Sequence, residues 1–206
     1  RMLQQKVTTD MPIHIIAIDE ATLAELGQYT DWGRGVYAEL LDKLCTDEYS
    51  PAVVAFDILF TSEKDAEGDT AFAEACKRAG NVVVGTNLEF KEVMVEKDGK
   101  KDLNRGYVER VVYPYDALLP YVRLGFANSE EDRSDNYMRT LMTTLDIGGG
   151  QQMDSFALAI HRAYNESQGL ETEDYSLREH NKYFFTYTGA PGDYHIVPMI
   201  EVLNGT

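Results

Sequence analysis

Three short runs of apolar, mostly β-branched residues, separated by helix-length segments, constrain the fold of this chain more than any other feature. Residues 13–18 (IHIIAI) and 53–60 (VVAFDILF) have the composition of strands that are buried on both faces. Residues 82–85 (VVVG) form the third run. Strands that alternate with helices in this way are parallel and are joined by right-handed crossovers. The sequence therefore predicts a β-α-β-α-β unit over residues 1–90.

The segments between these runs carry helix start and stop signals. Thr22 opens a sequence with capping-box spacing, and Gly27 can end the short helix that follows. Asp31 is the expected cap of a second helix, and Asp69 is the expected cap of a third. Both longer helices have one apolar side at helical spacing, so we expect them to pack on a sheet.

The second half of the chain predicts a polar hairpin, shorter strands and one more helix. Residues 89–112 alternate around Asp98 and Gly99, a dipeptide that suits a tight hairpin turn. The later elements expected are strands at 124–127, 137–147 and 183–187, and an amphipathic helix marked by Met153, Phe156, Ala157, Ile160 and Tyr164. The predicted fold class is α/β: a largely parallel or mixed central sheet flanked by helices in three layers, with the hairpin inserted at about 89–112.

Charge and length limit the partners. The 206 residues fit one domain and carry a net charge of −16 at pH 7. Such a field repels nucleic acid and anionic lipid, and the sequence has no Lys/Arg run to reverse it locally. The longest strongly apolar stretch, residues 51–60, is about half as long as a bilayer-spanning helix, and residues 1–6 lack a signal-peptide core. We therefore expect no nucleic-acid partner and no membrane-spanning segment within the sequence.

Two aspartates stand at the ends of the first two predicted strands. Ligands of open α/β sheets bind beyond the carboxyl ends of the strands, where Asp19 and Asp57 are expected. Together with Glu20 and Asn87 they could hold Mg²⁺ through oxygen atoms. Alternatively, each aspartate accepts backbone N–H bonds from the loop that follows it. We favour this second interpretation, without a metal or a cofactor, because no third ligand motif or phosphate-binding Lys-Thr or Lys-Ser step accompanies the pair.

Trp32 and Arg34 precede the second helix and are expected at the same rim of the sheet. The guanidinium group of Arg34 offers a planar fork for a carboxylate, and Trp32 offers a stacking face. An internal ion pair between Arg34 and either Asp19 or Asp57 is slightly favoured over direct ligand contact. Core packing is the corresponding alternative for Trp32, which is the single tryptophan of the chain.

The remaining candidates for chemistry are weak. The acidic segment 130–135 lacks the alternation of a calcium loop, and residues 148–150 lack the Lys-Thr step of a phosphate loop. The histidines share no short ligand spacing; they are His14, His161, His180 and His195. Cys45 and Cys76 are more consistent with two buried free thiols than with a disulfide. Without a complete catalytic constellation, the chain is predicted to sense rather than to catalyse.

Several segments, taken in order, resemble the CHASE2 family of extracytoplasmic sensory domains from bacterial adenylate cyclases, histidine kinases and Ser/Thr kinases. They are residues 15–27, 32–34, 53–60, 81–85, 124–128, 135–139, 155–164, 187–192 and 202–205. The chain departs from the family where residues 29–34 replace a Trp-Pro-Trp-Pro/Ser-Arg sequence, and where Asn136 replaces a glycine. The family continues beyond the segment that corresponds to residues 202–205 with another strand and transmembrane helices. The resemblance thus implies a single sensor domain over 1–206 that lacks its last strand and flanking helices.

The resemblance also implies a location and a function. The domain is expected on the extracellular or periplasmic side of the cell membrane, relaying ligand binding or partner contact to a cytoplasmic cyclase or kinase. It is not itself expected to be an enzyme. The partner is an unidentified small molecule or extracellular signal, with a homodimer possible through the parent receptor. The expected ligand-binding residues are Asp19, Trp32, Arg34, Asp57 and Asn128. The alternatives are a metal-dependent hydrolase or phosphatase that uses Asp19 and Asp57, and a dimerisation module without a ligand.

Overall fold

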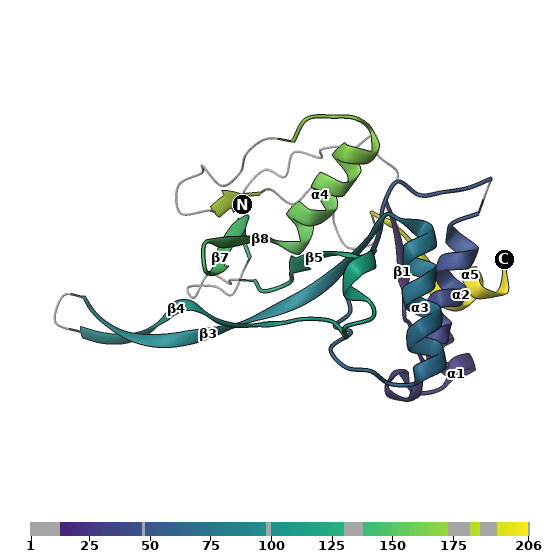
Figure 1. Ribbon diagram of the computed structural model, residues 1–206, viewed down its shortest axis with the longest axis horizontal. Helices are drawn as coiled ribbons and strands as arrows, with labels where there is room; N and C mark the ends of the chain where they lie inside the picture. Colours follow the sequence, from purple (N-terminus) through teal and green to yellow (C-terminus); the bar gives the residue numbers. More distant parts are fainter. Residues whose placement is uncertain are drawn as a thin grey trace. The chain divides into compact units, whose positions relative to one another are not determined.

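The computed structural model describes residues 13–46, 48–97, 100–129, 138–172, 182–185 and 193–205. The chain forms two compact units, each assembled from separate stretches of sequence (Figure 1). Unit 1 comprises Arg1–Pro51, Lys64–Ala79 and Phe185–Thr206, and unit 2 comprises Ala52–Glu63 and Gly80–Phe184. Helices occur together with parallel and antiparallel sheets, which confirms the predicted α/β class. A single sensor domain over 1–206 stays a prediction.

The sheet of unit 1 joins strands from the two ends of the described chain. Strand β1 (His14–Ala17) pairs in parallel with β10 (His195–Pro198), and the register places Ile15 opposite Ile196. The prediction that this first strand belongs with residues 53–60 in one sheet is therefore wrong. Burial on both faces was also wrong, because a two-stranded sheet leaves side chains open: Ile15 is 43% exposed and Ile196 is 52% exposed.

The helices of unit 1 are α1 (Glu20–Leu26), η1 (Tyr29–Asp31), α2 (Gly35–Leu44), α3 (Ala66–Ala79) and α5 (Met199–Asn204). Helices α2 and α3 pack side by side (Figure 1). Tyr37 of α2 and Phe72 of α3 are both buried, with ring centroids 5.7 Å apart. Leu41 of α2 and Cys76 of α3 also have almost no exposed surface. Each helix therefore buries the apolar side that its sequence predicts.

The starts of α1 and α2 in unit 1 differ from the predicted ones. Helix α1 is capped by Asp19, whose side chain accepts the Thr22 backbone N–H, so the helix begins before Thr22 rather than after it. Helix α2 begins after Arg34, whereas Asp31 lies in η1. The predicted end of α1 at Gly27 is confirmed, with φ of 82° at that glycine. Local sequence identified the helices but not the residues that start them.

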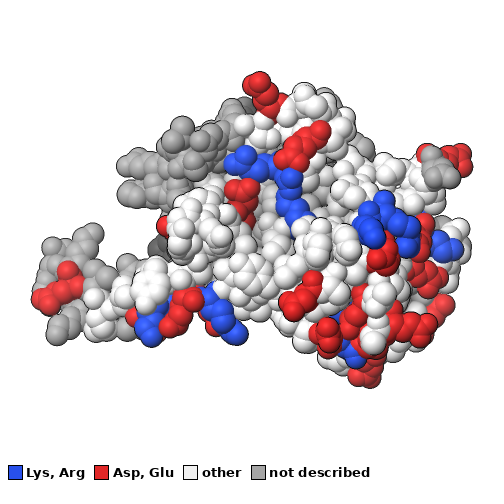
Figure 2. Space-filling model, in the orientation of Figure 1, with Lys and Arg blue, Asp and Glu red and all other residues white. Residues whose placement is uncertain are grey.

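Unit 2 contains three parallel strands and a long hairpin. Strands β2 (Val54–Phe56), β3 (Val82–Lys97) and β5 (Arg123–Phe126) are parallel, and β3 lies between the other two. This arrangement confirms the predicted parallel connection between the second and third strand runs. Strand β3 continues past residue 85 and pairs antiparallel with β4 (Lys100–Val112), which confirms the predicted hairpin. Charged side chains of both signs lie on the described part of this hairpin, where Lys91 pairs with Glu109 and Arg110 pairs with Glu89 (Figure 2).

The rest of unit 2 consists of small elements, of which β6, β7 and β8 contribute side chains to an apolar cluster. They are η2 (Leu119–Tyr121), β6 (Thr140–Met142), β7 (Thr144–Gly148), β8 (Gln151–Asp154), α4 (Phe156–Ser167) and β9 (Lys182–Phe184). Strands β6 and β9 pair with each other, as do β7 and β8. The cluster is built on Leu88, Phe126, Met142 and Met153, so Met153 belongs to β8 and not to the predicted helix. The described strands are divided among four sheets where the sequence predicts one central sheet.

Further sequence predictions concern turns, loops and membrane-spanning segments. The hairpin turn at Asp98 and Gly99, the acidic segment 130–135 and His180 are not described. Residues 148–150 form the turn between β7 and β8 with positive φ at each glycine, as a glycine turn predicts. Within the described part of the chain, no helix has both the length and the apolar character to cross a bilayer.

Candidate functional site

An open hollow of about 420 Å³ lies in unit 1 where α2 and α3 begin. It is lined by Leu26, Trp32, Gly33, Gly35, Val36, Asp65, Glu67, Gly68 and Ala71. Its volume falls in the range of about 300–1,000 Å³ that is typical of small-molecule sites. Trp32 is the member of the predicted ligand-binding set that lines it. The hollow is therefore the candidate site of unit 1.

Trp32 serves both the core and the hollow. The side chain is 7% exposed, and its Nε1 donates a hydrogen bond to the carbonyl oxygen of Gly27 at 3.1 Å. The rings of Tyr29 and Tyr37 flank it, with centroids 5.6 Å and 6.5 Å away. Burial and the proximity of Tyr29 raise the pKa of Tyr37, so its hydroxyl stays protonated. Most of the surface of the Trp32 side chain is therefore buried in the core, which was the alternative role considered for this residue.

Asp65 holds the first turns of both long helices. Its Oδ1 accepts the backbone N–H of Gly68 at 2.6 Å, which caps α3. Its Oδ2 accepts the backbone N–H of Arg34 at 3.1 Å, at the start of α2. The prediction of Asp69 as the cap of α3 is therefore wrong. One carboxylate satisfies N–H groups from two helix starts, where its negative charge also complements both helix dipoles.

Glycines let these two helix starts approach each other. An ideal Cβ at Gly68 lies 2.5 Å from Oδ1 of Asp65 and 2.8 Å from the backbone nitrogen of Gly35. A Cβ at Gly33 lies 2.9 Å from Oδ2 of the same aspartate. No side chain fits at Gly68 without moving backbone, so the bare main chain at this position shapes the hollow.

The guanidinium group of Arg34 pairs with Asp69. The Nε atom of Arg34 lies 3.3 Å from Oδ1 of Asp69, and the two side chains are 10% and 6% exposed. The other carboxylate oxygen of Asp69 accepts the backbone N–H of Lys64 at 2.8 Å. An internal ion pair was the favoured role for Arg34, but the predicted partners, Asp19 and Asp57, were wrong. The pair joins the start of α2 to the first turn of α3.

Asp19 acts as a local cap. Its Oδ1 accepts the backbone N–H of Thr22 at 3.0 Å and the Thr22 hydroxyl at 2.9 Å. These two donors lower the pKa of the Asp19 carboxyl. The Thr22 hydroxyl oxygen in turn accepts the backbone N–H of Ile200 at 3.3 Å, which ties α1 to the start of α5. Backbone bonding by the following turn, the favoured role for this aspartate, is confirmed.

The two remaining predicted site residues lie in unit 2. The side-chain amide of Asn128 donates to the carbonyl oxygen of Leu88 at 3.0 Å and accepts the Leu88 N–H at 2.8 Å. It therefore satisfies the main chain of β3 as a neighbouring strand would. Asp57 follows β2 and is exposed. The predicted set is thus divided, with Asp19, Trp32 and Arg34 in unit 1 and the other two in unit 2.

The comparison with known families decides the identity. The family model described as the CHASE2 domain matches residues 1–205. The chain belongs to the CHASE2 family. CHASE2 domains are sensory, non-catalytic domains of signal-transduction receptors and are typically extracytoplasmic. No curated protein and no solved structure matches this CHASE2 chain.

The groups that could carry chemistry in this CHASE2 domain are dispersed. Among the described residues, no group of three or more His, Cys, Asp or Glu side chains is placed to hold a metal ion. Cys45 and Cys76 are free thiols, the first half-buried and the second buried. Burial raises the pKa of Cys76 to about 12 and also raises that of Cys45. Both thiols are therefore protonated and weakly nucleophilic near neutral pH.

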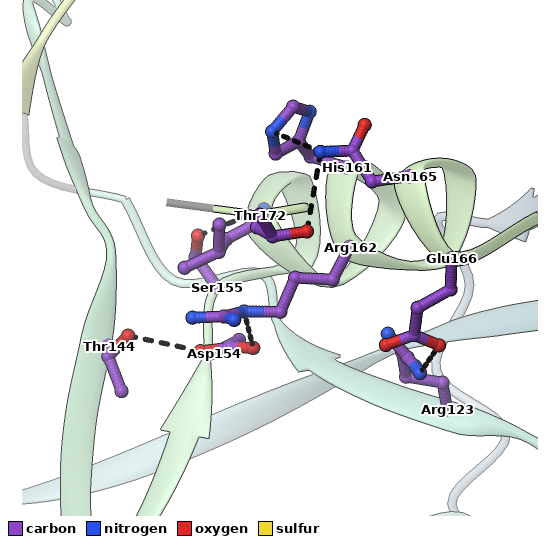
Figure 3. A network of polar contacts seen from close by, with 10 residues as sticks. Arg123, Thr144, Asp154, Ser155, His161, Arg162, Asn165, Glu166 and Thr172 are labelled. Carbon is purple, nitrogen blue, oxygen red and sulfur yellow. Dashed lines mark hydrogen bonds and ion pairs between the residues drawn. The ribbon is translucent and has the colours of Figure 1, made fainter. Parts of the chain in front are cut away.

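A polar network around α4 of the CHASE2 domain was missed by sequence analysis (Figure 3). Asp154 of β8 accepts from the Thr144 hydroxyl at 3.0 Å and pairs with Nε of Arg162 at 2.8 Å. Glu166, one turn further along α4, pairs with Arg123 of β5. The i, i+4 spacing of Arg162 and Glu166 is the signal that could have placed both on one helix face. These pairs connect α4 to two strands within unit 2.

Proposed function

We propose that this CHASE2 domain is the extracytoplasmic sensor of a membrane-anchored bacterial receptor, and that it relays ligand binding or partner contact to a cytoplasmic cyclase or kinase. The family match over residues 1–205 carries the proposal. A ligand that binds one of two conformations more tightly shifts their populations, so the relay requires no chemistry within the domain. Its own role is binding, and catalysis belongs to the parent receptor.

The hollow beside Trp32 is the proposed ligand site. Its apolar wall consists of Leu26, Val36 and Ala71 together with the indole ring. The Asp65 carboxylate is engaged by two backbone N–H groups, whereas Glu67 is exposed in the first turn of α3. An aromatic wall with a carboxylate at its edge suits a ligand with a small apolar body and a positively charged amine. The net charge of −16 favours the approach of such a cation.

The other predicted ligand-binding residues have two roles in this proposal. Asp19 and Arg34 hold the frame of unit 1 through the bonds of Asp19 to Thr22 and the ion pair of Arg34. Asp57 is exposed in unit 2 and remains a separate proposed contact, as does Asn128 at the edge of β3. If a ligand still raises the melting temperature after residues of the hollow are changed, Asp57 and Asn128 become the proposed contacts.

Thermal unfolding tests the sensor and its site. The chain is screened against small amines and their neutral analogues, and one amine class is expected to raise the melting temperature in a saturable way. At a ligand concentration of 100 times Kd the stabilisation is about 2.7 kcal/mol. Glu67→Gln is expected to abolish the shift without changing the unliganded melting temperature. Glu39→Gln, an exposed change on α2 outside the hollow, is the matched control and should retain it.

The outcomes separate the site from the function. A saturable shift that persists in Glu67→Gln rejects the hollow but keeps the sensory role, and Asp57→Ala then tests the contact in unit 2. In the full-length receptor, the same ligand should change the activity of the cytoplasmic enzyme. A ligand that binds the domain but leaves that activity unchanged would overturn the relay.

A dimerisation module without a ligand is the second candidate, because the sheet of unit 1 exposes apolar side chains. Ile13 is 48% exposed, Ile15 is 43% exposed and Ile196 is 52% exposed. Ile196 lies opposite Ile15 in the parallel register, so these two side chains form one apolar patch on the sheet, and Ile13 lies just before strand β1. If a second copy of the chain covers this patch, sedimentation equilibrium shows a dimer that Ile15→Thr dissociates. A monomer at all concentrations rejects this candidate.

A further inference from the structure

Two histidines face each other where the first and last described strands meet. His14 begins β1, His195 begins β10, and the parallel register pairs them directly. Their Nδ1 atoms are 3.0 Å apart, and the ring planes are inclined at 85° with centroids 5.2 Å apart. Both side chains are exposed. The residues are separated by 181 positions in sequence, so no local ligand spacing could reveal the pair.

The contact between the rings is one that a metal ion can replace. At 3.0 Å, one neutral imidazole donates its N–H to the lone pair of the other. Both Nδ1 atoms become ligands when the donating ring takes its other neutral tautomer, with the proton on Nε2, and an ion takes the place of the hydrogen bond. The backbone is already fixed, because the next three residue pairs of β1 and β10 are also in register. Only rotations about side-chain bonds are then needed to direct both lone pairs at one ion.

The nitrogen separation favours one type of coordination. Imidazole nitrogens lie about 2.1 Å from a bound first-row metal ion. Two nitrogens 3.0 Å apart then subtend an angle of about 90° at the ion. This is the angle between neighbouring ligands of tetragonal Cu²⁺, whereas tetrahedral Zn²⁺ requires nitrogens about 3.4 Å apart. Cu²⁺ also binds nitrogen ligands more tightly than the other divalent first-row ions.

We propose that His14 and His195 form a two-imidazole Cu²⁺ site that bridges β1 and β10. Water completes the coordination, since both rings are exposed. The net charge of −16 raises the concentration of cations near the surface. A bound ion holds together the strands nearest the two ends of the described chain, and so stabilises unit 1 by linkage. The site is separate from the hollow beside Trp32 and does not depend on the proposed function.

Copper titration of the 206-residue chain tests this site. The titration is followed by electron paramagnetic resonance in the presence of glycine, which competes for weak sites such as the amino terminus. We expect one tight equivalent of Cu²⁺ with hyperfine structure from two imidazole nitrogens, and a copper-dependent rise in melting temperature. His14→Gln and His195→Gln are each expected to raise Kd at least about tenfold and to remove the two-nitrogen signal.

Controls make each outcome decisive. Both substitutions are at exposed positions, so the melting temperature without copper should stay unchanged, which circular dichroism verifies. His161→Gln removes an imidazole from α4 in unit 2 and should leave the tight site intact. The proposal is overturned if the unmodified chain binds no Cu²⁺ against glycine, if either single variant binds as tightly as the unmodified chain, or if His161→Gln weakens binding equally.

Discussion

The ion pair between α2 and α3 in unit 1 and the ion pairs on the β3–β4 hairpin in unit 2 use the same chemistry in opposite surroundings. Arg34 and Asp69 are 10% and 6% exposed, whereas Arg110 and Glu89 are 66% and 46% exposed. The buried pair has lost its hydration, so each charge depends on its partner. Water screens the exposed pair, and either charge can be solvated alone. Burial therefore determines whether the loss of one charge from such a pair destabilises the fold strongly or hardly at all.

The largest expected effect comes from breaking the buried pair. Arg34→Met leaves the Asp69 charge buried without its partner, which should destabilise the protein by about 3–5 kcal/mol. Urea unfolding measures this as a lower midpoint. Arg110→Met on the hairpin is the matched control and should shift the midpoint far less. Equal shifts in the two variants would contradict the distinction between buried and exposed pairs.

A smaller loss is expected from closing the space between the helix starts of unit 1. In Gly68→Ala the new Cβ meets Oδ1 of Asp65 at 2.5 Å and the backbone nitrogen of Gly35 at 2.8 Å. We expect a destabilisation of about 1–3 kcal/mol in urea unfolding, although alanine is the better helix former.

Gly35→Ala provides the control for this steric argument. A Cβ at Gly35 has nothing within 4 Å, and the residue lies in the first turn of α2. The substitution should be neutral or should stabilise the protein by up to about 1 kcal/mol, because alanine restricts the unfolded chain. A loss in both variants would show that glycine flexibility, and not the close approach at Gly68, is what the site requires.

The pattern of correct and wrong predictions follows the range of the interactions. The hairpin at 89–112 and helix α4 were predictable, because the period-two and helical spacings of apolar residues are visible within short stretches of sequence. The pairing of β1 with β10 joins residues more than 180 positions apart, as the separation between His14 and His195 shows. No periodicity in either strand specifies that partner.

The candidate site shows the same limit at shorter range. The sequence placed Trp32 and Arg34 correctly at the start of α2, and an internal ion pair for Arg34 was the favoured role. Asp69, which pairs with this arginine, and Asp65, which caps α3, lie four residues apart. Aspartate is a favoured cap residue, so local capping preferences are compatible with either one. Only the packing of the two helices assigns the cap to Asp65 and the ion pair to Asp69.

Acid unfolding tests a third kind of carboxylate, Asp19, which is held by hydrogen bonds from Thr22 and not by an arginine. Donation from the backbone and hydroxyl of Thr22 lowers the pKa of Asp19 below its ordinary value of 3.8. This carboxylate therefore stabilises the fold above about pH 4, and the contribution disappears as the pH falls through the lowered folded-state pKa. Asp19→Asn should keep the cap at pH 7 and reduce the loss of stability as the pH falls below about 4.

The matched control for the acid experiment is Asp31→Asn, an exposed carboxyl in η1. This change removes one negative charge without removing a helix cap, so it should flatten the acid limb less than Asp19→Asn does. If Asp31→Asn flattens the acid limb as much as Asp19→Asn does, the effect comes from net charge. The hydrogen bonds at the start of α1 would then not be its cause.

The smallest expected effect belongs to the hairpin. Arg110 donates to Glu89 and lowers the pKa of that carboxyl, yet both side chains remain largely in water. Glu89→Gln should therefore shift the urea midpoint only slightly at low salt, and the difference should vanish at about 1 M NaCl, where the screening length is about 3 Å. The shift caused by Arg34→Met should persist at that salt concentration, because water and ions reach neither charge of the buried pair. A salt-sensitive Arg34 effect would mean that the α2–α3 junction is as open to solvent as the hairpin.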